Sequence, residues 1–173
     1  MKHLLALPLA AILFGGTAQA QTLAEIDKRD AAVLEAWNAT PLTIRRAIFV
    51  DGQPTGFGQY VERANNAFKK GDKFITYAEP VGYGFKDLGG GVYQLGFKVD
   101  IQLKSADGSK VIVSKDDFAE IAMKSHARNR EFNLLFNLSL GDTPPGDYLV
   151  EYKLHDIAST KTVSFSQPFK IVE

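Results

Sequence analysis

The sequence predicts a mainly β protein, in which one amphipathic N-terminal helix precedes a single antiparallel β-sandwich of seven to nine strands. After residue 41, apolar residues recur at every second position, as they do in strands that bury one face. Turn segments rich in Gly, Asp and Pro separate these alternating runs at short intervals. Long helical patterns do not occur between the strands, so a parallel sheet with helical crossovers is not expected.

Residues 1–20 have the pattern of a cleavable secretory signal peptide. Lys2 supplies a positive charge, an uncharged apolar run of eleven residues follows, and Ala18 and Ala20 place small side chains before the expected cleavage site. An apolar run of that length is too short to cross a hydrocarbon core about 30 Å thick. We therefore expect a periplasmic or secreted protein without an integral membrane segment after cleavage.

The composition narrows the class of protein further. Removal of residues 1–20 leaves 153 of the 173 residues, which suits one domain of ordinary size. The chain has no cysteine, so it has neither disulfides nor a thiol nucleophile, which fits a bacterial periplasm. After cleavage, 19 of the 20 Lys and Arg residues remain against 20 acidic residues. With charges so balanced, the protein has no overall positive potential to attract nucleic acid, so no nucleic-acid partner is expected.

The segment 21–40 is expected to hold the helix. Its apolar residues recur with helical spacing as far as Trp37, and Thr22 and Glu25 form a capping box at its start. Asp30 falls within the apolar stripe, so we expect the helix to pack along only part of its length. Two alternatives stay open, because the helix could pack on its own β-sandwich or on a partner chain.

The β-sandwich is expected over residues 41–173. Pro168 falls within the last strand, which indicates an edge strand or a bulge there. For 116–129, the apolar spacing favours a short helix or an irregular loop over a strand. The strands are expected at about 42–50, 57–63, 73–79, 92–104, 110–114, 131–140, 147–155 and 161–172.

The turn Pro144-Pro145-Gly146-Asp147 leads directly into Tyr148 before the penultimate strand. This segment resembles the loop before the penultimate strand of immunoglobulin and fibronectin type III β-sandwiches. It is also similar to a tyrosine corner, in which the tyrosine hydroxyl bonds to nearby backbone. The resemblance implies an immunoglobulin-like or fibronectin-like fold and no particular activity, because proteins of very different function share it.

A second resemblance rests on three shorter segments. Gly58-Gln59-Tyr60-Val61-Glu62-Arg63, Lys70-Gly71-Asp72 and the run from Tyr77 to Tyr83 are similar to sequences of uncharacterised exported bacterial proteins. This resemblance implies export and attaches no chemistry to any residue.

The sequence contains no complete catalytic motif, so we expect a protein that is not an enzyme and that has no metal and no cofactor. The exported chain holds only two histidines, His126 and His155, and no Gly-x-Ser-x-Gly motif. Two separated histidines without cysteine are too few for a zinc site. The alternative is a hydrolase or lyase that acts on an envelope polymer through Glu79, Asp100 and Arg63.

Candidate binding residues fall in two groups. Lys124, His126, Arg128 and Arg130 form the densest basic stretch, and in an extended conformation they would project to one side. Such a surface could receive an anionic glycan, a phospholipid head group or an acidic protein loop, while a solvated surface is the alternative. Arg45-Arg46 is a second, smaller basic spot.

The second group is aromatic. Several aromatic side chains lie in or beside Gly-rich segments, where with Arg63 and Glu79 they could line a small pocket or instead cover the open end of the sandwich. They are Phe57, Tyr60, Tyr83 and Phe85. The sequence therefore predicts an exported cell-envelope binding protein whose partner is an unknown envelope protein or glycan.

Overall fold

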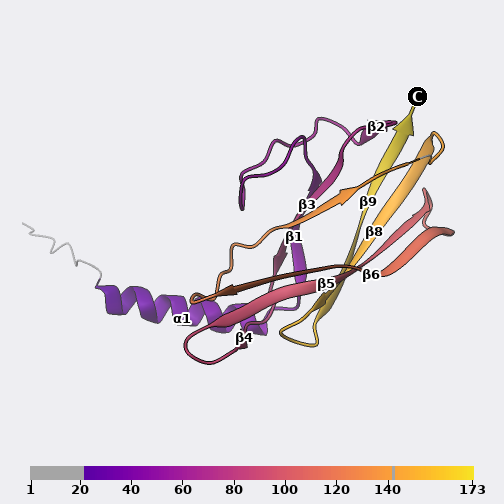
Figure 1. Cartoon of the computed structure of the whole chain (residues 1–173). Helices are drawn as coiled ribbons and strands as arrows, with labels where there is room; N and C mark the ends of the chain where they lie inside the picture. The colour runs from indigo at the N-terminus through magenta and orange to yellow at the C-terminus, as the bar shows by residue number, and fades with distance from the viewer. Residues whose placement is uncertain (1–21, 142) are drawn as a thin grey trace, which may run out of the picture.

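The computed structural model describes residues 22–141 and 143–173, so the predicted signal peptide at 1–20 lies outside the described residues. Within them, one helix precedes nine strands that form two sheets (Figure 1). The elements are α1 (Leu23–Ala39), β1 (Thr43–Phe49), β2 (Ala67–Lys69), β3 (Phe74–Val81), β4 (Lys86–Asp87), β5 (Tyr93–Ser105), β6 (Val111–Ser125), β7 (Leu134–Leu138), β8 (Gly146–Asp156) and β9 (Thr162–Val172).

The two sheets differ in size and in strand direction. The small sheet has the order β1-β3-β7, and both of its pairs are antiparallel. The large sheet has the order β2-β9-β8-β5-β4, and β6 also pairs with β5. In the large sheet β2 runs parallel to β9, whereas the other pairs are antiparallel. This mixed sheet curls strongly into a half-barrel.

The predicted fold class is therefore confirmed only in its outline, a mainly β chain with one N-terminal helix. The expected single antiparallel sandwich of the immunoglobulin or fibronectin type is wrong, because the large sheet is mixed and curled. The physical reason lies in β2, whose three residues, Ala67–Lys69, pair with Lys170–Val172. A strand of three residues is too short to produce a readable alternation in the sequence.

Two predicted segments differ from the structure. The helix or loop expected at 116–129 is wrong as far as Ser125, because β6 continues through it as a strand. Lys115 pairs with Ile101 and Ala119 pairs with Val99, so β6 advances four residues where β5 advances two. The extra residues form a bulge that interrupts the alternation. The strand expected at 57–63 is instead a loop with the isolated bridges Val50↔Glu62 and Gly56↔Gln59.

The strand predicted at 110–114 corresponds to the first part of β6, and the other predicted strands correspond to β1, β3, β5, β7, β8 and β9, with shifted ends. At Pro168, β9 pairs with Leu149 of β8, and on its other side the Pro168 carbonyl accepts a hydrogen bond from Asn66 Nδ2 at 3.0 Å. The edge strand or bulge predicted from Pro168 is wrong, because β9 lies between β2 and β8 and pairs with β8 without a register shift. The proline is tolerated because β2 pairs only with Lys170–Val172, so no strand needs a hydrogen bond from position 168. The Tyr148 hydroxyl donates to the Pro144 carbonyl at 2.9 Å, as the likeness to a tyrosine corner predicts.

The core between the sheets is built largely from aromatic rings. The ring of Phe136 from the small sheet stacks on Tyr152 from the large sheet, with centroids 4.4 Å apart. Phe74 of β3 meets Phe169 of β9 edge-on at 4.8 Å. These pairs bury large apolar surfaces with defined ring geometry, so they fix how one sheet lies on the other.

Only the C-terminal end of α1 packs on the body of the protein, and the rest projects away from it (Figure 1). The side chain of Leu23 is 72% exposed and that of Ile26 is 53% exposed, whereas Trp37 is buried. Trp37 Nε1 donates to the Tyr83 carbonyl at 2.8 Å, and the two rings meet edge-on. The partial packing predicted for this helix is confirmed.

The helix begins where the sequence predicts. The Thr22 hydroxyl accepts a hydrogen bond from the Glu25 backbone N–H at 3.3 Å, which satisfies one of the free donors of the first turn. The Glu25 carboxylate accepts from Arg29 one turn later at 3.0 Å. The projecting part of α1 is therefore held as a helix by local contacts.

Lys161, in the turn between β8 and β9, fastens the end of α1 to the sheets. Its Nζ donates to the carbonyls of Asn38 at 2.9 Å, Thr40 at 2.7 Å and Gly82 at 2.7 Å. Gly82 has a φ of +81°, and a Cβ at this position would lie 2.6 Å from the Pro41 carbonyl oxygen. Only glycine therefore allows β3 to end against the residues that follow the helix.

Replacing Trp37 with Ala is expected to lower the free energy of unfolding by about 3–5 kcal/mol, because the change leaves a cavity and an unpaired buried carbonyl. Ile26→Ala on the projecting part of α1 is expected to change it by less than about 0.5 kcal/mol. Equilibrium unfolding in urea, followed by circular dichroism, measures both values. Equal losses in the two variants would contradict the packing described.

Candidate functional site

A groove of about 470 Å³ lies between α1, the start of β1, the loop that follows β1 and the segment that follows β6. We call it the arginine groove, because three arginines line it. Apolar and aromatic side chains form the remainder of its wall together with one amide and one carboxylate. The lining residues are Val33, Trp37, Arg45, Phe57, Arg128, Asn129, Arg130 and Glu131.

A bulge on β1 places Arg45 in this groove. Ile44 pairs with Pro80 and Arg46 pairs with Glu79, so Arg45 has no partner of its own on β3. An extra residue in a strand redirects its side chain and those after it. Arg45 is exposed and lines the groove, whereas the guanidinium of Arg46 lies 6.0 Å from the Tyr60 ring.

The segment after β6 is fixed by backbone contacts. The Tyr83 hydroxyl donates to the Asn129 carbonyl at 2.7 Å, and His126 Nδ1 lies 3.2 Å from the Gly91 carbonyl oxygen. Burial raises the pKa of the Tyr83 hydroxyl above its ordinary value of 10, so it stays protonated and keeps donating. Arg128 and Arg130 flank Asn129, so this bond sets the position of both.

The three guanidinium groups have different surroundings. Arg130 forms an ion pair with Asp30 of α1, which links the segment to the helix. The Arg128 guanidinium lies over the Tyr93 ring, 4.2 Å from its centroid. Arg45 forms no ion pair with any residue in the ranges that the structure describes. The planar fork of arginine binds carboxylate or phosphate through two parallel hydrogen bonds.

The charge balance of the groove is positive. Its three arginines face one carboxylate in the lining, Glu131, and one beside it, Asp30. The whole chain has 20 basic and 20 acidic side chains, so this surplus is local. A local positive surplus in a concave site attracts anions more strongly than the net charge of the protein would.

The predicted basic stretch does not stay together. Lys124 lies on β6 opposite Gln94, and His126 turns to the Gly91 carbonyl. Arg128 and Arg130 line the groove. There they meet one residue of the smaller basic spot and one of the aromatic candidates, which the sequence suggests as separate groups. Those residues are Arg45 and Phe57. Sequence reasoning missed Val33 and Trp37 as groove residues, because their helical spacing indicates only core packing.

Arg63 serves as a clamp between loops. Its guanidinium donates to Asp51 at 2.8 Å, to Asp72 at 2.9 Å and to the Ala67 carbonyl at 2.9 Å. It also lies over the Phe68 ring, 4.3 Å from the centroid. These contacts tie the loop after β1 to the turn before β3, so its hydrogen-bonding groups are largely occupied.

Glu79 lies on the outer side of the small sheet. It is 7% exposed and accepts a hydrogen bond from the Tyr77 hydroxyl at 2.9 Å. The Tyr77 oxygen in turn accepts from the Gly58 N–H at 2.8 Å, and burial raises the pKa of Tyr77 to about 12. This chain of bonds holds the loop after β1 over the sheet, where the Tyr60 ring lies tilted against the Tyr77 ring with centroids 4.6 Å apart.

Asp100 lies on β5 of the large sheet. Its carboxylate lies 2.7 Å from His155 Nε2 and accepts the Asp117 N–H at 3.0 Å. Glu79, Asp100 and Arg63 are thus on three separate elements, and each has its own partners. The other aromatic candidates, Tyr83 and Phe85, pack together at 5.5 Å against the core.

The comparisons with known proteins leave the chain without an assigned family. No family model matches it, and no curated protein matches it. Within the described ranges, no three His, Asp or Glu side chains gather as metal ligands would. In that part of the chain, no helix has both the length and the apolar character needed to span a membrane.

The stability of the β6 bulge is expected to depend on pH. Hydrogen bonds from His155 and from the Asp117 backbone hold the pKa of Asp100 below its ordinary value of 3.8. A lowered pKa stabilises the fold above pH 3.8, and the contribution is lost as the pH falls through the folded-state pKa. Asp100→Asn should therefore cost about 1 kcal/mol at pH 6 and much less near pH 2.

Urea unfolding of the wild type and of Asp100→Asn at several values of pH measures this difference. The control is Asp116→Asn, which changes a neighbouring exposed carboxylate. A difference between Asp100→Asn and the wild type that stays constant from pH 6 to pH 2 would contradict the assignment.

Proposed function

We propose that this chain is an exported cell-envelope binding protein, not an enzyme, and that its arginine groove binds an anionic glycan. The observation that carries the proposal is the convergence of Arg45, Arg128 and Arg130 on one groove. The signal-peptide pattern of residues 1–20 and the likeness to uncharacterised exported bacterial proteins support the location.

The chemistry of the lining favours a carboxylate or phosphate as the bound group. Arg45 is free of ion pairs within the described residues, so an incoming anion need not displace a carboxylate from it. Arg128 and Arg130 are held in place by Tyr93 and Asp30. Guanidinium groups that are already positioned lose less freedom when they bind an anion.

The size of the groove favours a glycan segment over a protein surface. Its volume of about 470 Å³ falls within the range of small-ligand pockets, about 300–1,000 Å³. A stable protein interface needs about 800 Å² on each partner, which is far more than one such groove supplies. Phe57 and Val33, which is 50% exposed, add an apolar wall against which the less polar face of a sugar ring can pack.

The alternative function, a hydrolase or lyase that uses Glu79, Asp100 and Arg63, has no comparable support. Glycoside hydrolysis needs two carboxylates about 5–10 Å apart across one cleft. Glu79 belongs to the small sheet and Asp100 to the large sheet, where each is engaged by its own partners.

Arg45→Gln is expected to weaken the binding of an acidic oligosaccharide by about tenfold or more, because it removes one charge-assisted pair. Arg46→Gln is the matched control, since Arg46 is the next residue of the same strand and lies beside Tyr60. Isothermal titration calorimetry with oligogalacturonate measures both affinities, and neutral dextran oligomers of equal length test the need for charge.

Two results would contradict the proposed function. One is equal weakening by Arg45→Gln and Arg46→Gln, which would place binding elsewhere on the surface. The other is equal affinity for the acidic and the neutral oligosaccharide, because a site built on guanidinium groups requires an anion.

A further inference from the structure

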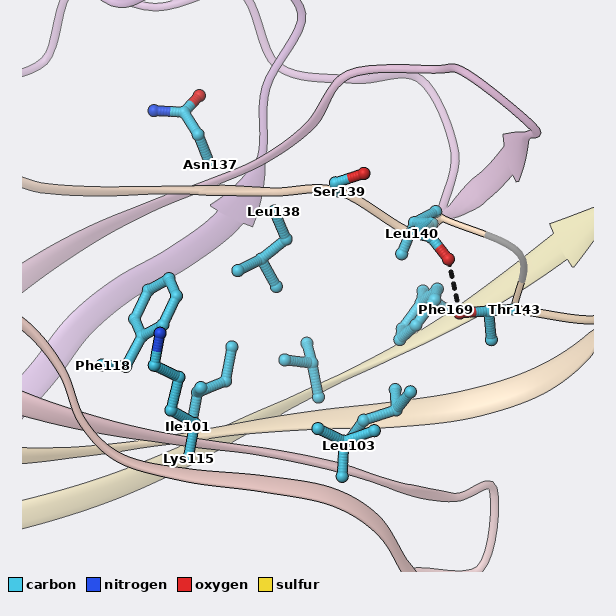
Figure 2. Close-up of a pocket in the computed structure, with 12 residues that line it drawn as sticks. Ile101, Leu103, Lys115, Phe118, Asn137, Leu138, Ser139, Leu140, Thr143 and Phe169 are labelled. Atoms are coloured by element: carbon cyan, nitrogen blue, oxygen red, sulfur yellow. Dashed lines mark hydrogen bonds between the residues drawn. The ribbon is translucent and has the colours of Figure 1, made fainter.

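A second cavity, of about 290 Å³, opens between β6 of the large sheet and β7 of the small sheet (Figure 2). We call it the apolar cleft, because eight of its twelve lining side chains are hydrocarbon or aromatic. Strands β5, β6, β7, β8 and β9 and the loop after β7 contribute to it. The lining residues are Ile101, Leu103, Val113, Lys115, Phe118, Asn137, Leu138, Ser139, Leu140, Thr143, Val150 and Phe169.

The cleft follows from the way β6 pairs with β5. Lys115 pairs with Ile101 and Val113 pairs with Leu103, so all four side chains lie on the concave side of the large sheet. Beyond Lys115 the bulge displaces the strand. In Figure 2, Phe118 stands on the opposite side of the cavity from the Leu140 and Thr143 end.

Lys115 is the only charged side chain in this lining. Its Nζ lies 5.6 Å from the centroid of the Phe118 ring, and it forms no ion pair within residues 22–141 and 143–173. Lys115 is exposed, so its ammonium group stays hydrated at the opening of the cleft, with the Phe118 ring beside it. The opening of the cleft therefore offers one position for a negative charge, at the boundary between solvent and the apolar lining.

The apolar surface continues outside the cleft. Val111 is 48% exposed and Val113 is 55% exposed, although β-branched side chains of this kind are usually buried. Both belong to the part of β6 that borders the opening. An apolar ligand longer than the cleft would find further apolar surface along this strand.

We propose that the apolar cleft binds one acyl chain of an anionic amphiphile, with the head group at Lys115. The apolar lining accounts for the chain, and the single cation accounts for the charge of the head. The volume lies at the lower limit of small-ligand pockets, so it accommodates one chain and not two. This site shares no residue with the arginine groove, so the proposal does not rest on the glycan-binding function.

The test uses dodecanoate and dodecanol, below their aggregation concentrations, as probes of the purified chain by isothermal titration calorimetry. Dodecanoate is expected to bind one to one, and Lys115→Gln is expected to weaken it by about tenfold while leaving dodecanol affinity unchanged. The matched control, Lys153→Gln, changes an exposed lysine of β8 and should alter neither affinity.

A second variant tests where the acyl chain binds. Val113→Trp adds bulk at an exposed position of the cleft, so it should block both probes by tenfold or more without lowering the melting temperature. Unchanged binding in Val113→Trp, or no saturable binding by the wild type, would overturn the proposal. A Lys115→Gln protein that binds dodecanoate as tightly as the wild type but self-associates through β6 would also overturn it. That result would mean that Lys115 only protects an exposed strand edge from pairing with another copy.

Discussion

The ammonium group of Lys161 is the contact on which the arrangement of this protein depends. A lysine amine has three hydrogen-bond donors, and here they meet three carbonyls that come from the end of α1, the residue after it and the end of β3. Trp37 reinforces the junction by donating to the Tyr83 carbonyl. One end of the helix is thereby fixed to both sheets, while the rest projects. This junction also positions Val33 and Trp37, the two residues that α1 contributes to the arginine groove.

Strand β6 connects the two cavities. Its first part borders the apolar cleft, and the segment after its end supplies Arg128 and Arg130 to the arginine groove. The bulge between these parts is fastened by Asp100, which accepts the Asp117 N–H. Among the described strands β6 pairs only with β5, so its other edge is unpaired. Both cavities therefore adjoin β6 or the segment that follows it.

The alternating segments predicted most of the strands because each buries one face continuously, as β5, β8 and β9 do. The pattern failed in β6, where Lys115, Asp116 and Asp117 break the apolar alternation at the bulge. Sequence reasoning also identified Arg45, Arg128 and Arg130 as basic positions. It could not bring them together, because their meeting depends on long-range bonds such as Tyr83 to Asn129, which leave no local signal. Arg63 differs from these three arginines, because it forms ion pairs with two carboxylates, Asp51 and Asp72. The residues next to Arg63 in the sequence do not predict these ion pairs.

The most direct test of the central claim is a nuclear magnetic resonance titration that follows the arginine Nε–H signals of the intact protein as oligogalacturonate is added. We expect the signals of Arg45, Arg128 and Arg130 to shift together with one dissociation constant, while that of Arg63 stays in place. Shifts confined to Arg63, or spread evenly over all arginines, would contradict a groove built at the anchored end of α1.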